Sequence, residues 1–296
     1  MIHFVYPYDT ARIAAPWSIG NHVAAELRAR GHEVKQYDWE DEWSIIPGLG
    51  DILLGHPHPE PGHVWENSAK ASGWDRIVAL SPLPVAADAR AASARHVAAA
   101  DHWLLLAGPR WQHLVDEYPR ATRLDMAIDP AEFPPLDIPD TRPTRRFITI
   151  GCTLPVKNPW LMADLSLRLP YHFSHIGPGR VGGRVVDVGN GQLATPEARE
   201  HLAAHDFLIM TSTEDANPTT VLEALCWGLI PICTAGCGWD FPLMLPYDAD
   251  HAALVLSYIA SMDSHWLRAQ RAIGRRLALE YSWTRFVDVV EAACLG

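Results

Sequence analysis

The stretch 206–238 constrains the fold of this chain more than any other. It opens with a short apolar run, DFLIM, that ends in Thr and Ser, as is typical of a buried strand leading into a loop. Asn217 is a preferred helix-capping residue and Pro218 a preferred first helical residue, so a helix is expected over 218–227, ending at Gly228. A second apolar run, LIPICT, follows. This order predicts a βαβ unit, and open α/β sheets bind ligands at the carboxyl ends of their strands.

The start of this helix is a candidate anion site, because a helix N-terminus offers unpaired N–H groups and partial positive charge. The residues expected to seat a phosphate are Pro218, Thr219 and Thr220. Glu223 lies in the second turn, where a carboxylate can accept hydrogen bonds from both hydroxyls of a ribose. The alternative for Glu223 is a solvated helix residue. Glu214 and Asp215 lie in the preceding loop, where a plain polar turn is the alternative interpretation.

Composition indicates a globular protein of one large or two medium domains. The 296 residues are 48% hydrophobic and 20% charged, which argues against disorder. The net charge of −11 disfavours a non-specific nucleic-acid binder, since phosphate backbones are held mainly by Lys and Arg. No apolar run reaches about 18 residues and no secretory signal is recognisable, so no membrane span is expected and a cytoplasmic location is predicted. The five cysteines show no CxxC spacing and suggest reduced thiols, and no metal site is predicted.

The rest of the chain alternates between apolar runs and helical patterns, which predicts an α/β fold. Strands are expected at 2–6, 32–34, 51–54, 76–80, 102–106, 147–150, 171–176, 185–188, 206–210 and 229–234. Helices are expected at 21–30, 86–99, 111–118, 196–204, 218–227, 250–261 and 265–280, with a last one running from 281 to 294. The prolines in 130–143 predict a stiff linker between two domains.

Two loops of the first half carry further candidates. Gly20 follows the first strand as a possible close-approach glycine, at the place where a Rossmann half binds its ligand. His56 and His58 lie in a loop rich in Pro and Gly after the third strand. Surface histidines without a role are the alternative for both.

Several of these segments resemble the retaining glycosyltransferases of the two-Rossmann-domain (GT-B) architecture, family 4 in particular. The family's signature places two acids with seven residues between them, the second within Leu-Glu-Ala. Asp215 and Glu223 have this spacing, whereas Glu214 fits only through a one-residue bulge. Smaller likenesses lie at Ala127-Ile128-Asp129 with Phe133-Pro134, and at Gly177-Pro178-Gly179.

The resemblance implies two Rossmann-like domains, 1–140 and 141–280, facing each other across a cleft, with a terminal helix over 281–296 that packs back on the first. It also implies transfer of a sugar from a nucleoside diphosphate donor, of UDP or GDP type, with retention at the anomeric carbon. Donor sugar hydroxyls would meet Glu214 or Asp215 and a histidine, His56 or His58. No essential metal or other cofactor is expected.

The diphosphate would meet Lys157, which matches the family's lysine, and the helix start. Cys152 stands where the family often has Arg, and Arg180, beside the Gly177 turn, is a candidate to replace that charge. Glu223 would hold the ribose, and the turn at 189–191 would receive the base.

The acceptor stays open between a small metabolite, a glycan and a modified nucleobase in DNA, and the oligomeric state is not predicted. Two rival interpretations are a nucleotide-sugar epimerase of the same architecture and a non-catalytic nucleotide-sugar binding protein.

Overall fold

The computed structural model describes residues 1–12, 15–58, 60, 62–189, 193 and 195–296. The chain divides into two compact units, each built around its own six-stranded sheet. Unit 1 comprises Met1–Ala127 and Ser282–Gly296, and unit 2 comprises Ile128–Tyr281. Every strand pairing in both sheets is parallel, so each unit is of the α/β class that the sequence predicts.

The sheet of unit 1 has the strand order β2-β1-β3-β4-β5-β6. Its strands are β1 Ile2–Val5, β2 Val34–Tyr37, β3 Ile52–Gly55, β4 Arg76–Pro82, β5 His102–Leu106 and β6 Ala121–Leu124. The order reverses between β1 and β3, and the loops after these two strands therefore flank the place where such sheets bind ligands.

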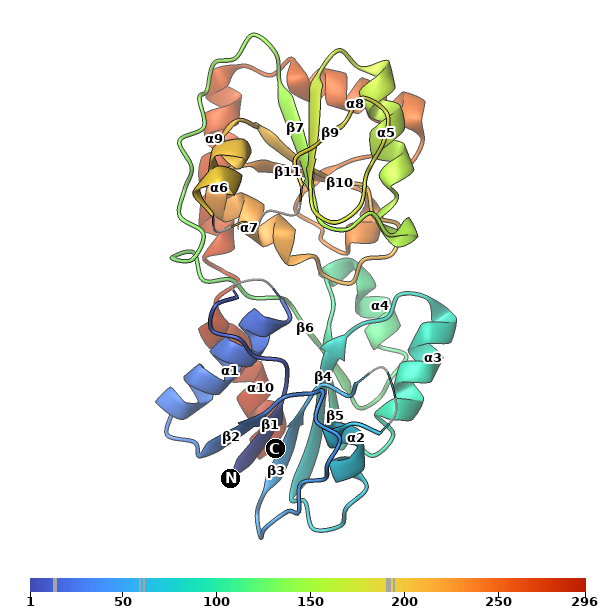
Figure 1. Ribbon diagram of the computed structural model, residues 1–296, viewed down its shortest axis with the longest axis vertical. Coiled ribbons are helices and arrows are strands. Elements are labelled where there is room, and N and C mark those ends of the chain that lie inside the picture. The colour runs from blue at the N-terminus through green and yellow to red at the C-terminus, as the bar shows by residue number, and fades with distance from the viewer. Residues whose placement is uncertain (13–14, 59, 61, 190–192, 194) are drawn as a thin grey trace. The chain divides into compact units, whose positions relative to one another are not determined.

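Helices cover both faces of this sheet (Figure 1). They are α1 Trp17–Ala29, α2 Val64–Ala69, α3 Ala87–His96, the short 3-10 turn η1 Pro109–Trp111, α4 Gln112–Val115 and α10 Trp283–Leu295. The terminal helix α10 packs beside α1 and against β4 and β5. Arg30 donates to Glu291 at 2.7 Å, and the His22 ring stacks on Trp283 at 4.6 Å between centroids. The predicted return of the last helix to the first domain is therefore confirmed.

The sheet of unit 2 has the order β12-β11-β10-β7-β8-β9. Its strands are β7 Arg146–Ile150, β8 His172–Ile176, β9 Val186–Asp187, β10 Phe207–Met210, β11 Ile230–Cys233 and β12 Leu243–Met244. Counted from the first strand of the unit, this is the 3-2-1-4-5-6 order of the Rossmann fold, and its reversal lies between β7 and β10.

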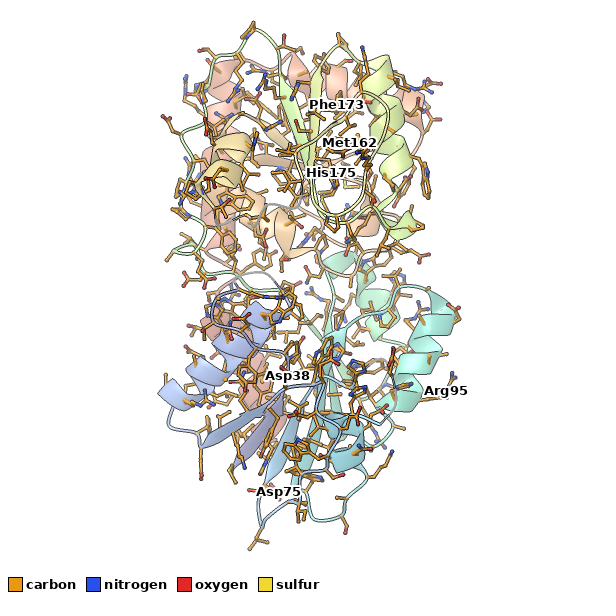
Figure 2. The ribbon with its side chains drawn as sticks, in the orientation of Figure 1. Asp38, Asp75, Arg95, Met162, Phe173 and His175 are labelled. Atoms are coloured by element: carbon orange, nitrogen blue, oxygen red, sulfur yellow. The ribbon has the colours of Figure 1, made fainter. Side chains whose placement is uncertain are left out.

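The helices of unit 2 lie in two layers around a buried apolar core. They are η2 Pro155–Lys157, α5 Pro159–Arg168, α6 Pro196–Ala203, α7 Thr219–Trp227, η3 Ala235–Cys237, α8 Ala249–Ala260 and α9 Ser264–Ala278. Helix α5 packs with α8, and α7 packs with α9, on opposite sides of the sheet (Figure 1). Met162 of α5 and Phe173 of β8 belong to the core between helix and sheet (Figure 2).

The segment after β6 is part of unit 2 and is not a free linker. Ile128 N donates to Tyr281 O at 2.8 Å, and Leu136 N donates to Trp227 O at 3.0 Å. The ring of Phe133, only 3% exposed, packs edge-on against Trp227. Unit 2 therefore begins at residue 128, before the expected boundary near 140, because these contacts fasten residues 128–140 to it.

None of the helices in the described part of the chain has the length and apolar character that a membrane crossing requires.

Candidate functional site

The reversal of strand order in unit 2 brings together two loops that are far apart in the sequence. Loop 151–158 follows β7, and loop 211–218 follows β10, which is the neighbour of β7 in the sheet. Because both strands run in the same direction, both loops leave the same edge of the sheet. Lys157 and Asp215 reach each other in this way.

Lys157 and Asp215 form an ion pair in which the Nζ atom donates to Oδ2. Ser212 donates its hydroxyl to the same carboxylate oxygen at 3.2 Å, and Asp215 N donates to Gly236 O at 2.7 Å. The Lys157 side chain is 28% exposed and that of Asp215 is 13% exposed. The ammonium group is thus held at one point and is still partly open to a ligand.

Backbone hydrogen bonds fix the two loops to each other. Thr213 N donates to Val156 O at 2.8 Å, and the Thr211 hydroxyl donates to Lys157 O at 2.9 Å. The position of Lys157 is therefore set by the loop after β10 and does not depend on its own loop alone.

The two candidate acids of this loop differ in their surroundings. Asp215 faces Lys157, whereas Glu214 is exposed and forms no ion pair within the described residues. The geometry therefore associates the acid that has the family spacing, Asp215, with the predicted lysine. The contact of either acid with a sugar stays a prediction.

Helix α7 begins one residue later than expected. Pro218 is its N-cap, in an extended conformation, and the first helical residue is Thr219. No side chain caps the helix, and the Pro218 carbonyl accepts a hydrogen bond from the indole of Trp239 at 3.1 Å. The prediction of Asn217 as the cap was wrong, because the extended backbone of Pro218 takes that position. The first N–H groups of the helix, at Thr219 and Thr220, have no acceptor within the helix.

Asn217 and Glu223 are buried polar groups with unused hydrogen-bonding capacity. Asn217 is 8% exposed and Glu223 is 4% exposed. In the part of the chain that the structure describes, both polar atoms of the Asn217 amide and the Oε2 atom of Glu223 lack a hydrogen-bond partner. An unpaired buried polar group costs about 1–3 kcal/mol, so such groups call for a missing partner such as a ligand. Sequence reasoning missed Asn217 as a site residue.

The environment of Glu223 changes its acidity. Burial raises its pKa to about 7, and a hydrogen bond from Thr219 acts in the opposite direction. The alternative of a solvated helix residue is therefore wrong. The unpaired oxygen of this carboxylate can accept hydroxyl donors, and near neutral pH the group is close to the midpoint of its titration.

The turn after β8 is shaped by glycine. Gly177 has a φ of +147°, and a Cβ atom there would lie 2.1 Å from the carbonyl oxygen of Gly151. His175, two residues earlier, has its Nε2 atom 2.7 Å from the same carbonyl oxygen. The turns after β7 and β8 therefore meet backbone to backbone.

The other predicted site residues near this turn have fewer contacts that would hold them in place. Arg180 is exposed, and no described residue forms an ion pair with it. Cys152 is half-buried and occupies the position of the expected arginine. Asn190 and Gly191 of the predicted base-binding turn lie outside the described residues.

The candidates of unit 1 lie around its own reversal of strand order. Gly20 in α1 is a packing position, since a Cβ atom there would lie 2.1 Å from Pro7 O in the loop after β1. His56 N donates to Val5 O at 2.9 Å, and burial lowers the pKa of the His56 ring to about 4. His58 is 8% exposed and packs edge-on against Trp39. Neither ring is a freely exposed surface histidine, and their expected contact with a donor sugar stays a prediction.

Comparisons with known proteins find similarity at the level of structure. No protein-family model matches the sequence, and no curated protein matches it. WaaG, a glycosyltransferase involved in lipopolysaccharide biosynthesis, matches with a TM-score of 0.65 at 18% identity over 100% of both chains. Sucrose-phosphate synthase from Thermosynechococcus elongatus matches with a TM-score of 0.75 at 13% identity, over 98% of this chain and 97% of that one.

A third structure, described as trehalose-6-phosphate from E. coli bound with UDP-2-fluoro glucose, matches with a TM-score of 0.71 at 10% identity, over 100% of this chain and 99% of that one. At these identities the likeness establishes the fold alone. The chain accordingly has the two-unit α/β fold of these GT-B glycosyltransferase structures.

Proposed function

We propose that this protein is a glycosyltransferase that moves a sugar from a nucleoside diphosphate donor to an acceptor hydroxyl, with retention of anomeric configuration. The observation that carries the proposal is the buried carboxylate of Glu223. Its Oε2 atom has no hydrogen-bond partner among the described residues, and no side chain caps the first N–H groups of the same helix. A ribose with two hydroxyl donors suits the carboxylate, and a phosphate suits the helix start. The fold comparisons support the same class of ligand, because one similar structure is bound with UDP-2-fluoro glucose.

In the proposed reaction, the bond between the anomeric carbon and the diphosphate oxygen breaks while the acceptor oxygen forms a bond to the same carbon. The proton of the acceptor hydroxyl passes to the leaving diphosphate, on which negative charge develops. Lys157 and the N–H groups of Thr219 and Thr220 would stabilise this charge, as preorganised donors do in other enzymes. The ammonium group of Lys157 has three donors and gives one to Asp215, so the other two stay available. Lysine and helix would thus do the work that a metal ion does at other diphosphate sites.

Asp215 would serve two purposes in this proposal. Its carboxylate holds Lys157 in place, and the resemblance to family 4 assigns the acid with this spacing to the hydroxyls of the donor sugar. Arg180 is exposed and would supply a further cation only after moving towards the ligand. The donor nucleotide is expected to be of UDP or GDP type, and the acceptor class stays open.

The experiment begins with calorimetric titration of the purified chain with UDP, GDP, ADP and TDP, and with the nucleoside of the best ligand. Lys157→Ala should weaken binding of the diphosphate about 10-fold to 100-fold and leave the nucleoside almost unchanged, because a charge-assisted hydrogen bond contributes about 1.5–3 kcal/mol. Glu223→Ala should abolish the binding of both. The matched control is Lys70→Ala, which removes an exposed lysine in unit 1.

Equal losses for nucleoside and diphosphate in Lys157→Ala would refute its phosphate role. Activity assays with the sugar donor of the best-binding nucleotide then distinguish a glycosyltransferase from an epimerase and from a non-catalytic binding protein. Transfer to an acceptor, with the anomeric configuration of the product read by NMR coupling constants, supports the proposal. An epimer formed without an acceptor indicates an epimerase, and binding without turnover across a wide acceptor screen indicates a non-catalytic binding protein.

A further inference from the structure

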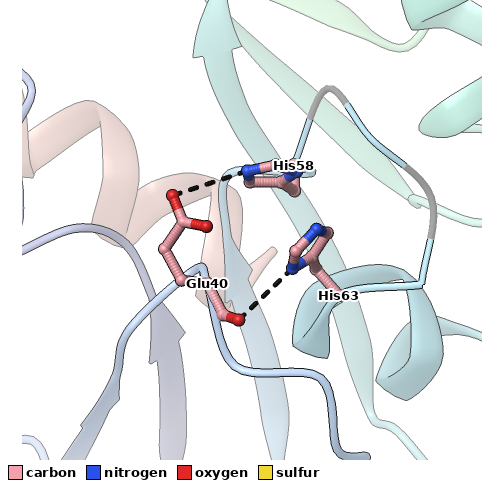
Figure 3. A group of neighbouring side chains, drawn as sticks. All are labelled: Glu40, His58 and His63. Atoms are coloured by element: carbon pink, nitrogen blue, oxygen red, sulfur yellow. Dashed lines mark hydrogen bonds and ion pairs between the residues drawn. The ribbon is translucent and has the colours of Figure 1, made fainter.

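Three potential metal ligands converge in unit 1, whereas the residues of the candidate nucleotide site belong to unit 2. They are the carboxylate of Glu40 and the imidazoles of His58 and His63 (Figure 3). Each side chain offers one ligand atom, and these atoms all lie within 4.8 Å of one another. Glu40 lies in the loop after β2, His58 in the loop after β3, and His63 immediately before α2. The cluster therefore joins two loops whose strands are not neighbours in the sheet.

The spacing of Glu40 and His58 fits two ligands of one ion better than a direct contact. The Nε2 atom of His58 lies 3.6 Å from Oε1 of Glu40. That distance is too long for a normal N–H to O hydrogen bond. Two ligands about 2.1 Å from a tetrahedral ion lie roughly 3.4 Å apart, so only a small adjustment would place an ion between them.

Hydrogen bonds orient the imidazole of His63 as a ligand. Its Nδ1 atom lies 3.3 Å from the Glu40 backbone carbonyl, to which a protonated Nδ1 donates (Figure 3). This leaves Nε2 with its lone pair for a metal. Metal-binding histidines in proteins almost always donate their second N–H to a carbonyl, a carboxylate or water, which fixes the tautomer and the ring.

Contacts at the Nδ1 atom and on the ring hold the imidazole of His58 in place. Glu60 N donates to its Nδ1 atom at 3.0 Å, and the Glu60 carbonyl oxygen lies 3.3 Å from the same atom. A metal at Nε2 requires the tautomer in which Nδ1 carries the proton and donates to that carbonyl oxygen. Trp39 packs edge-on against the ring at 5.2 Å between centroids, and the ring of His63 lies 3.7 Å away. The buried ring is therefore fixed with Nε2 towards Glu40.

We propose that Glu40, His58 and His63 bind one divalent transition-metal ion, of which Zn²⁺ is the representative. Two imidazole nitrogens and one carboxylate are a ligand set of zinc proteins, and the nitrogen ligands disfavour Ca²⁺ and Mg²⁺. Three protein ligands leave one tetrahedral position for water or for an oxygen atom of a bound molecule. The bound ion would link Glu40, which follows β2, to His58 and His63, which lie between β3 and α2.

The test uses the untagged full chain after treatment with a chelator. Calorimetric titration with Zn²⁺ should give one site per chain, and Co²⁺ should give the visible absorption of a tetrahedral ion without a thiolate charge-transfer band. Glu40→Gln and His63→Gln should each weaken Zn²⁺ binding by more than about 100-fold, because loss of an outer-shell partner alone costs 10-fold to 100-fold. The matched controls are Glu42→Gln, an exposed acid in the same loop, and His265→Gln, an exposed histidine in unit 2.

Unfolding temperatures measured without metal identify any variant that is simply misfolded. Absence of a stoichiometric site in the wild-type chain overturns the proposal. Wild-type affinity in both Glu40→Gln and His63→Gln also overturns it, because the ion then binds elsewhere. Equal losses in the two control variants would point to diffuse surface binding and would likewise overturn it.

Discussion

Replacing Glu223 by Gln should change the pH dependence of stability in a defined direction. Burial raises the pKa of this carboxyl from an ordinary value of 4.5 to about 7 in the folded chain. Below about pH 4.5 the group is protonated whether the chain is folded or unfolded, and it causes no destabilisation. As the pH rises from 4.5 to 7, the unfolded chain releases the proton while the folded chain retains it. The free energy of unfolding therefore falls with pH.

The size of this effect follows from the two pKa values. Each tenfold difference in acidity corresponds to about 1.4 kcal/mol, so the buried carboxylate destabilises unit 2 by about 3 kcal/mol above pH 7. Glutamine has a similar size and cannot ionise. The Glu223→Gln variant should thus gain up to about 3 kcal/mol over the wild-type chain between pH 4.5 and pH 8.

Urea unfolding followed by tryptophan fluorescence, repeated at intervals from pH 4.5 to pH 8.5, measures this difference. Where the two units unfold in separate transitions, only the transition of unit 2 should shift. The amide also changes local hydrogen bonding, but that contribution does not vary with pH, so the slope is the quantity to compare. Glu214→Gln is the control, since it makes the same chemical change at an exposed position in the loop before α7. A difference between wild type and Glu223→Gln that stays flat across this range would refute the reasoning.

Two further predictions concern unit 2. Asp215→Asn should raise the affinity for the free nucleoside diphosphate a few-fold, because it releases Lys157 from its ion pair, and should lower the rate of sugar transfer. Asp137→Asn, the same change at an exposed position, should change neither quantity, and calorimetry with initial-rate assays compares the two variants. Asp206→Asn should destabilise the chain by about 1–3 kcal/mol, because Asp206 is fully buried and Arg271, itself 5% exposed, would lose one of its two carboxylate partners and keep only Asp140 at 2.7 Å. Urea unfolding tests this against Asp137→Asn, an exposed control, and equal stability of the two variants would contradict it.

Much of the fold follows from local sequence patterns. Apolar runs bounded by Gly, Pro and polar residues located ten of the strands, and Gly31 and Gly228 ended helices as expected, with φ values of +92° and +89°. Helix α5 was missed because its apolar residues follow directly on the prolines of the preceding loop. Helix α2 was missed because it lies beside a loop rich in Pro and Gly. Two strands were missed: β6, because its sequence ATRL has no apolar run, and β12, because its two residues lie between Pro242 and Pro246.

The candidate site was predictable where topology brings strand ends together. Lys157 and Asp215 were each singled out by their place after a strand, and the parallel order of β7 and β10 supplies their contact. The burial of Asn217 was not predictable in the same way, because an Asn-Pro step reads as a helix cap until the backbone of Pro218 is seen. The cluster of Glu40, His58 and His63 depends on the packing of two separate loops, and no short spacing in the sequence indicates it.

At the candidate nucleotide site, backbone N–H groups and a buried carboxylate are better placed to bind a nucleotide than cationic side chains are. Lys157 is already paired with Asp215, Cys152 replaces an expected arginine, and Arg180 is exposed and without an ion pair among the described residues. The first turn of α7 contains no acidic residue and has no side-chain cap, so its N–H groups carry a partial positive charge. Glu223 cannot attract a phosphate, but its unpaired oxygen gains a partner when a ribose binds. The nucleoside should therefore contribute most of the binding specificity. The diphosphate should be held mainly by the N–H groups at the start of α7 and by the N–H donors of Lys157 that do not bind Asp215.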